Sequence, residues 1–131
     1  MDAEAIREIF HGLGTVHIRR MFGGQGIYRG ELMFALEADG ELYLKVDDET
    51  VAHFRDLGSR PFSFPTRNGR TSITSYWLMP ESALDDPDEA RDYAVSALAA
   101  ARRAKARKDS KAAGARKATK KTRKPAAEPA T

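Results

Sequence analysis

The sequence predicts an α+β fold of two layers, an antiparallel β-sheet with helices on one face, in the order helix, three or four strands, helix, two strands, helix. Three observations lead to this prediction. Several short segments alternate apolar and polar residues as strands do, three others have helical periodicity, and the dipeptides Asp39-Gly40 and Asn68-Gly69 are typical of tight hairpin turns. Because hairpins join antiparallel neighbours, the economical arrangement places the helices on one face of such a sheet.

An amphipathic helix is expected over residues 2–13, where apolar residues recur at helical spacing opposite charged ones. Asp2 can cap its start, and a nearby glycine can end it. The alternation at Val16 and Ile18 then predicts a strand, and a short apolar strand containing Ile27 follows it.

The strand pair at residues 31–38 and 41–46 has the clearest alternation. Each strand has one apolar face and one mixed face, as expected of a sheet covered on one side. Between them, Asp39 and Gly40 both tolerate the positive φ angles of a type I′ turn. This pair is therefore expected to form a hairpin.

A second hairpin is expected between residues 61–66 and 70–80, with Asn68-Gly69 as its turn signal. Pro65 indicates that the first of these strands lies at a sheet edge or bends there. On the second strand, regular alternation predicts that Ile73 and Trp77 share one face while Tyr76 lies on the other.

Two further helices flank this hairpin. The first is expected over residues 47–58, where an apolar stripe ends at Gly58, a residue suited to the position after a helix. The second is expected to begin with Asp86 as its cap and Pro87 as its first residue. Its apolar stripe continues to Ala101, and beyond this point alanine is the only apolar helix-forming residue.

Charge divides the chain into two parts. Residues 102–131, called the basic segment below, hold twelve lysines and arginines against two acids, a net charge of +10, whereas residues 1–101 hold ten against seventeen acids, a net charge of −7. The basic segment has too little apolar surface to offset the entropy of ordering, so we expect it to be disordered when free, although the last helix can extend into it. The expected organisation is a folded domain over residues 1–104 and a disordered basic tail over residues 105–131.

The cations of the basic segment predict binding to a polyanion. They can follow a phosphate backbone and release its counterions, and the absence of aromatic side chains predicts binding that is largely independent of base sequence. DNA is the expected partner, with RNA left open, and the alternative is a segment that folds back on the acidic body. The residues expected to bind nucleic acid are Arg102, Arg103, Lys105, Arg107, Lys108, Lys111, Arg116, Lys117, Lys120, Lys121, Arg123 and Lys124.

The sequence lacks the patterns that common enzymes, cofactors and metals require. It has no cysteine, its three histidines fall on separate expected elements, and its glycines form neither a P-loop nor a dinucleotide-binding loop. We therefore expect no catalytic residue, no cofactor and no metal. No apolar run approaches the roughly 18 residues of a membrane helix, and the N-terminus has no signal-peptide core, so we expect a cytoplasmic protein with no membrane contact.

One tripeptide raises an enzymatic alternative. Gly23-Gly24-Gln25 is the tripeptide that class I release factors place in the peptidyl transferase centre, and small ribosome-rescue hydrolases combine it with a basic tail. The large apolar residues on both sides, such as Met21 and Ile27, indicate instead a turn attached to a core. Gln25 is then interpreted as a substitutable residue on that turn, and a peptidyl-tRNA hydrolase is kept as the remote alternative.

The stretches RRMFGGQGIY, LMFALEADGELYLKVDDE, FRDLGSRPFSF and SYWLMPESALDDPDEARDYAVSALAAA together resemble the N-terminal domain of the TfoX (Sxy) family of competence regulators. The resemblance extends in order from about residue 7 to about residue 104. It implies a two-layer α+β domain and a role in transcription regulation, the best-known members promoting the expression of DNA-uptake genes, and it supplies no catalytic residues. The residues of the family's motif turn are Arg20, Met21, Phe22, Gly23, Gly24 and Gly26.

This chain has the basic segment where longer family members have a second, helical C-terminal domain. We therefore expect a non-enzymatic regulator whose body contacts a protein partner or forms a homodimer while the basic segment binds DNA. The alternative is a ligand- or protein-binding module whose tail is incidental. An apolar strip of Met33, Ala35, Tyr43 and Tyr76 on an uncovered sheet face would favour a homodimer.

Overall fold

The computed structural model describes residues 1–21 and 23–122, with side chains described as far as residue 110. Within these residues it contains a six-stranded antiparallel sheet and three α-helices in the predicted order, so the α+β class is confirmed. The α-helices are α1 (Ala3–Ile9), α2 (Val51–Asp56) and α3 (Pro87–Thr122), and 3₁₀ helices lie at His11–Leu13 and Glu81–Asp85. The strands are β1 (His17–Met21), β2 (Gly24–Arg29), β3 (Leu32–Ala38), β4 (Glu41–Lys45), β5 (Pro61–Thr66) and β6 (Gly69–Leu78).

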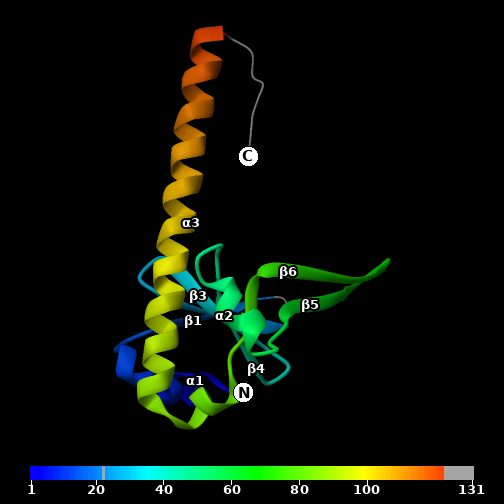
Figure 1. Cartoon of the computed structure of the whole chain (residues 1–131), viewed down its shortest axis with the longest axis vertical. Coiled ribbons are helices and arrows are strands. Elements are labelled where there is room, and N and C mark those ends of the chain that lie inside the picture. The colour runs from blue at the N-terminus through cyan, green and yellow to red at the C-terminus, as the bar shows by residue number, and fades with distance from the viewer. Residues whose placement is uncertain (22, 123–131) are drawn as a thin grey trace. The chain divides into compact units, whose positions relative to one another are not determined.

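Most neighbouring strands are consecutive in the sequence. The strand order is β1-β2-β3-β4-β6-β5, and these neighbours pair antiparallel. α2 leads the chain from β4 to the edge strand β5, and β6 then returns beside β4 (Figure 1). Hairpins therefore build most of the sheet, and Pro65 lies on an edge strand as predicted.

Both predicted hairpins form, but their turns differ. Asp39 has a φ of 52° and Gly40 a φ of 82°, which are the positive angles of the expected type I′ turn. In the second hairpin Thr66 pairs with Gly69. The positive φ there, 120°, falls on Gly69 alone and not on Asn68.

The helices cover one face of the sheet. The core on this face combines residues of α1, α2 and α3 with residues of β2, β3, β4 and β6. The rings of Phe10 and Phe34 meet edge to face, with centroids 5.4 Å apart and an interplanar angle of 80°, an arrangement that aromatic pairs prefer. The largest fully buried side chains are Phe10, Phe34, Ile6, Ile27 and Leu44.

α3 begins where the sequence predicts and packs through small side chains. Asp86 Oδ1 accepts hydrogen bonds from the backbone N–H groups of Asp88 and Glu89, at 3.1 and 3.2 Å, which caps the helix. Burial along the helix ends at Ala101, where the first compact unit of the chain also ends, while the predicted domain boundary at residue 104 stays a prediction. The α3 residues in the core are Ala90, Ala94, Ala97 and Leu98.

The alternation predicted along β6 is wrong at the middle of the strand. Pro61 pairs with Trp77, but the next residue of β5, Phe62, pairs with Ile73. Residues 74–76 of β6 therefore have no separate partner in β5, and such an irregularity resets which face the side chains occupy. As a result, Ile73 lines the same cavity as Tyr76, although the sequence pattern places the two on opposite faces.

We predict that Ala94→Leu lowers the free energy of unfolding by about 1–3 kcal/mol, because the fully buried Ala94 leaves no room for a larger side chain. Val95→Leu, one position further and 44% exposed, is the matched control, and it should change the free energy by less than about 0.5 kcal/mol. Urea unfolding followed by Trp77 fluorescence measures both. Equal effects of the two substitutions would show that α3 does not pack through this side.

Candidate functional site

The glycine pair of the Gly23-Gly24-Gln25 tripeptide lies at the tight connection between β1 and β2. Gly23 has a φ of 77°, which favours glycine. Gly24 is the first residue of β2, and a Cβ on it would lie 2.3 Å from the carbonyl oxygen of Glu37. The connection between the strands thus requires the backbone freedom of Gly23, and the close approach of β3 requires the missing side chain of Gly24. Phe22 of the predicted motif turn lies outside the described residues.

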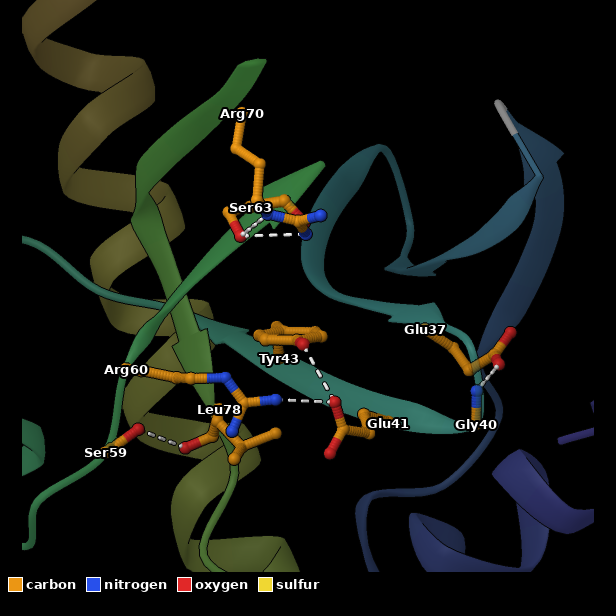
Figure 2. Close-up of polar contacts among 9 residues, drawn as sticks. All are labelled: Glu37, Gly40, Glu41, Tyr43, Ser59, Arg60, Ser63, Arg70 and Leu78. Carbon is orange, nitrogen blue, oxygen red and sulfur yellow. Dashed lines mark hydrogen bonds and ion pairs between the residues drawn. The ribbon is translucent and has the colours of Figure 1, made fainter. Parts of the chain in front are cut away.

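The Gln25 side chain is held by the body of the protein. Gln25 belongs to β2, and its Nε2 donates hydrogen bonds to Glu37 Oε1 and to the carbonyl oxygen of Met1, both at 2.9 Å. Glu37 is only 6% exposed, and its Oε2 accepts a hydrogen bond from the backbone N–H of Gly40 at 2.8 Å (Figure 2). The interpretation of Gln25 as a turn residue is therefore wrong, because the residue lies on β2 and its amide donates to a buried carboxylate.

The sheet face opposite the helices, called the open face below, has an apolar cluster of its own. Ala35, expected on this face, is instead fully buried in the helix-side core. The reason is an irregularity in the pairing of β2 with β3 at Ile27 and Tyr28, which breaks the alternation along β3. The open-face cluster consists of Leu36, Tyr43 and Tyr76, packed with Met33, Ala38, Phe62 and Leu78.

A cavity of about 320 Å³, called the open-face pocket below, lies on this side of the sheet. Residues of β1, β2 and β3 line one part of it, and residues of β5 and β6 line the rest. These strands stand at opposite ends of the strand order, so the sheet must curve for them to share one cavity. The apolar side chains at the cavity include Met21, Met33, Leu36, Phe62, Phe64 and Ile73.

Gly26 leaves room for the side chains of Met21 and Met33 beside β2. A Cβ on Gly26 would lie 2.9 Å from Met21 Sδ and 2.9 Å from Met33 Sδ. A side chain at position 26 would therefore press against both sulfur atoms. Two residues of the predicted motif turn, Met21 and Gly26, thus shape the open face, while Arg20 stands opposite Gln25 in the pairing of β1 with β2.

Polar contacts lie beside Tyr43 of the open face and along the β5–β6 hairpin (Figure 2). Glu41 Oε1 accepts hydrogen bonds from Tyr43 Oη at 3.1 Å and from Arg60 Nη2 at 2.7 Å. Arg70 donates to the side chain of Ser63 through Nε, at 3.2 Å. Burial raises the pKa of Tyr43, and the hydrogen bond to Glu41 acts in the same direction, so this phenol stays protonated as a donor.

Tyr76 is the second buried tyrosine of the open-face cluster. Burial raises its pKa to about 12, and Tyr28 contributes in the same direction. Its Oη donates a hydrogen bond to the carbonyl oxygen of Met33 at 3.3 Å, and the Lys45 ammonium lies 5.1 Å from its ring centroid. The neutral hydroxyl is therefore part of the wall of the open-face pocket.

α3 continues through much of the basic segment, as far as Thr122. Whether the segment is disordered when free stays a prediction. Lys111, Arg116, Lys117, Lys120 and Lys121 lie on this helix, and Arg123 and Lys124 lie outside the described residues. The predicted nucleic-acid contacts with described side chains are Arg102, Arg103, Lys105, Arg107 and Lys108, all of them exposed except the partly exposed Arg103.

These five cations are spread around the helix. At 3.6 residues per turn, their spacing leaves no side of the helix without a cation. One cation has an acidic neighbour on the same helix, because Lys105 Nζ lies 3.0 Å from Asp109 Oδ2. The arrangement presents positive charge in all directions rather than as a single stripe.

The three histidines lie on three different elements, with His11 in a 3₁₀ helix, His17 in β1 and His53 in α2. His53 Nε2 lies 2.7 Å from Tyr93 Oη. Among the described residues, no cluster of three or more histidine, aspartate and glutamate side chains could hold a metal ion. In the same part of the chain, no helix combines the length and apolar character needed to cross a bilayer.

Comparison with known proteins agrees with this fold. The family model described as TfoX N-terminal domain matches residues 8–101. The chain belongs to this family. Over 50 residues it is 42% identical to a protein of Aliivibrio fischeri named DNA transformation protein TfoX1. That match covers 38% of this chain and 24% of the relative, so the chain matches about a quarter of the relative's length.

The TfoX N-terminal domain match ends at residue 101, where burial along α3 also ends. The resemblance seen in the sequence is therefore confirmed, and the basic segment falls outside the matched domain. The open-face pocket was not predicted from the sequence. No sequence pattern indicates that Met21 and Met33 lie beside Gly26 and share a cavity with residues of β5 and β6, because this arrangement depends on the curvature of the sheet.

Gln25→Ala should lower the free energy of unfolding by about 1–3 kcal/mol, because Glu37 would stay buried with one hydrogen bond lost. Gln25→Glu should be more destabilising at neutral pH, since it sets a second carboxylate against the first. Urea unfolding measures both variants. A fully stable Gln25→Ala protein would show that the amide does not stabilise this part of the sheet.

The raised pKa of Tyr76 should make the stability of the protein fall with pH in strong alkali. Its pKa is raised from the ordinary 10.0 to about 12 in the folded protein, so the folded state keeps a proton that the unfolded state loses. This contribution to stability is complete below pH 10 and is lost as the pH rises toward 12. Tyr76→Phe should flatten the fall in stability over that range in urea unfolding, and an unchanged slope would contradict the assignment.

Proposed function

We propose that the protein is a non-enzymatic regulator of the TfoX type whose basic segment supplies affinity for nucleic acid, with DNA as the first partner to test. One observation carries the proposal. The buried residues of α3 and the family domain both end at Ala101, and a block of net charge +10 begins with the next residue. A charged block that contributes no buried side chain among the described residues can bind a polyanion without disturbing the core.

The chemistry of the basic segment supports binding to phosphates rather than to bases. Lysine and arginine side chains neutralise phosphates and release counterions, and the cations with described side chains stand on all sides of α3. The sequence of the segment has no aromatic side chain that could stack on a base. The proposed interaction is therefore largely independent of base sequence, and regulatory specificity would come from contacts of the body.

Two further observations support this proposal. The named relative is a DNA transformation protein, which favours a role of the regulator type for the shared domain. The hydrogen bonds of Gln25 to Glu37 and Met1 favour a structural over a hydrolytic role for the Gly23-Gly24-Gln25 tripeptide, because catalysis by such a tripeptide needs a mobile loop. Location in the cytoplasm stays a prediction from the sequence.

Gel shifts at several salt concentrations test the proposal, with a duplex DNA and an RNA of equal length as probes. A truncation after Ala101 keeps every described buried residue, and it should lose binding to both probes. In the full chain, changing Arg102, Arg103, Lys105, Arg107 and Lys108 to glutamine should make the slope of log K against log salt shallower by up to about 4–5 units.

The matched control changes five exposed arginines of the body to glutamine, namely Arg7, Arg20, Arg55, Arg67 and Arg91. It removes the same charge and should leave the salt slope close to that of the unchanged protein. Equal binding by the truncation, or an equal loss in the control, would mean that the basic segment is not the nucleic-acid site.

A further inference from the structure

The geometry points to the open-face pocket as a binding site for a small, neutral aromatic molecule. This inference is independent of the affinity for nucleic acid proposed above. The pocket has a volume of about 320 Å³, within the range of natural ligand pockets. An apolar cavity of about 150 Å³ holds benzene, so this pocket suits a molecule of about two rings.

The side chains at the pocket favour an aromatic occupant. The thioether sulfurs of Met21 and Met33 both lie beside Gly26, and sulfur makes favourable contacts with aromatic rings. Phe62 and Phe64 are stacked in the wall supplied by β5, with centroids 5.8 Å apart and an interplanar angle of 26°. A flat apolar molecule would thus meet polarisable sulfur and aromatic rings in the same cavity.

The polar side chains at the pocket already have partners within the protein, which favours a neutral occupant. Tyr76 Oη donates to the Met33 carbonyl oxygen, and the Gln25 amide donates to the Glu37 carboxylate. The other carboxylate oxygen of Glu37 accepts from Gly40. An anionic ligand would lose its hydration without gaining a counterion among these groups, at a large cost in free energy. A cationic ligand would have to compete with the Met1 ammonium, which lies 3.6 Å from Glu37 Oε2.

The shape of the pocket favours a small molecule over a second copy of this chain. Sheet faces that pack together meet as extended, interdigitating layers. Here side chains from both ends of the sheet, such as Met21 on β1 and Phe64 on β5, line one cavity. A concave, apolar site of this kind surrounds a small ligand, whereas a second sheet would contact only its rim.

Fluorescence titration with the neutral probe N-phenyl-1-naphthylamine tests the inference on the full chain. Ile73→Glu places a charge at the pocket, and Val95→Glu places one on α3 at a similar exposure, 37% against 44%. The unchanged protein and Val95→Glu should bind one probe per chain, and Ile73→Glu should bind at least about tenfold more weakly because the charge must be desolvated. Ala38→Phe, which fills the pocket without adding charge, should also weaken binding, and circular dichroism checks that each variant folds.

Oxidation by hydrogen peroxide, read by mass spectrometry, locates the bound probe. The probe should slow the oxidation of Met21 and Met33, while the exposed Met1 serves as the internal reference. No binding, or equal binding by all folded variants, would overturn the inference. A concentration-dependent dimer in sedimentation that protects Met21 and Met33 without any probe would also overturn it, because the face would then belong to a second copy.

Discussion

Burial of one sheet face beneath the helices is the constraint on which the rest of the structure depends. Ile27, Phe34 and Leu44 are fully buried on this side, and α3 contributes mainly alanines to the same core. Burial along α3 ends at Ala101, and the sequence after this residue has no large apolar side chain and carries cations at many positions. Among the described elements, no helix covers the open face, where side chains of the strands form the open-face cluster and line the open-face pocket.

Features decided within a few residues could be predicted from the sequence. The cap at Asp86 and the type I′ turn at Asp39-Gly40 depend on local geometry that those residue types favour. The faces of Ala35 and Ile73 could not be predicted, because each lies near an irregular pairing that depends on the neighbouring strand. The open-face pocket could not be predicted either, because Ile73 lines it only as a result of the irregular pairing of β5 with β6.

Gln25 illustrates the same limit at the level of a single side chain. Its sequence context offers a catalytic tripeptide or a turn, and both interpretations consider only its immediate neighbours. The structure instead joins its amide to Glu37, on the next strand of the sheet. A buried carboxylate needs such a donor, so the residue has a structural role that no local pattern indicates. The tripeptide therefore has a structural role in the sheet of the family domain. The cations of the basic segment lie outside the matched domain.

NMR titration of the labelled full chain with a short DNA duplex tests most directly whether nucleic-acid contacts begin where the buried core ends. Amide signals from Arg102 onward should shift or broaden as duplex is added, and the signals of Met33, Leu36 and Tyr76 on the open face should stay in place. Large shifts on the open face with an unperturbed basic segment would contradict the proposed division between a folded body and a nucleic-acid-binding segment.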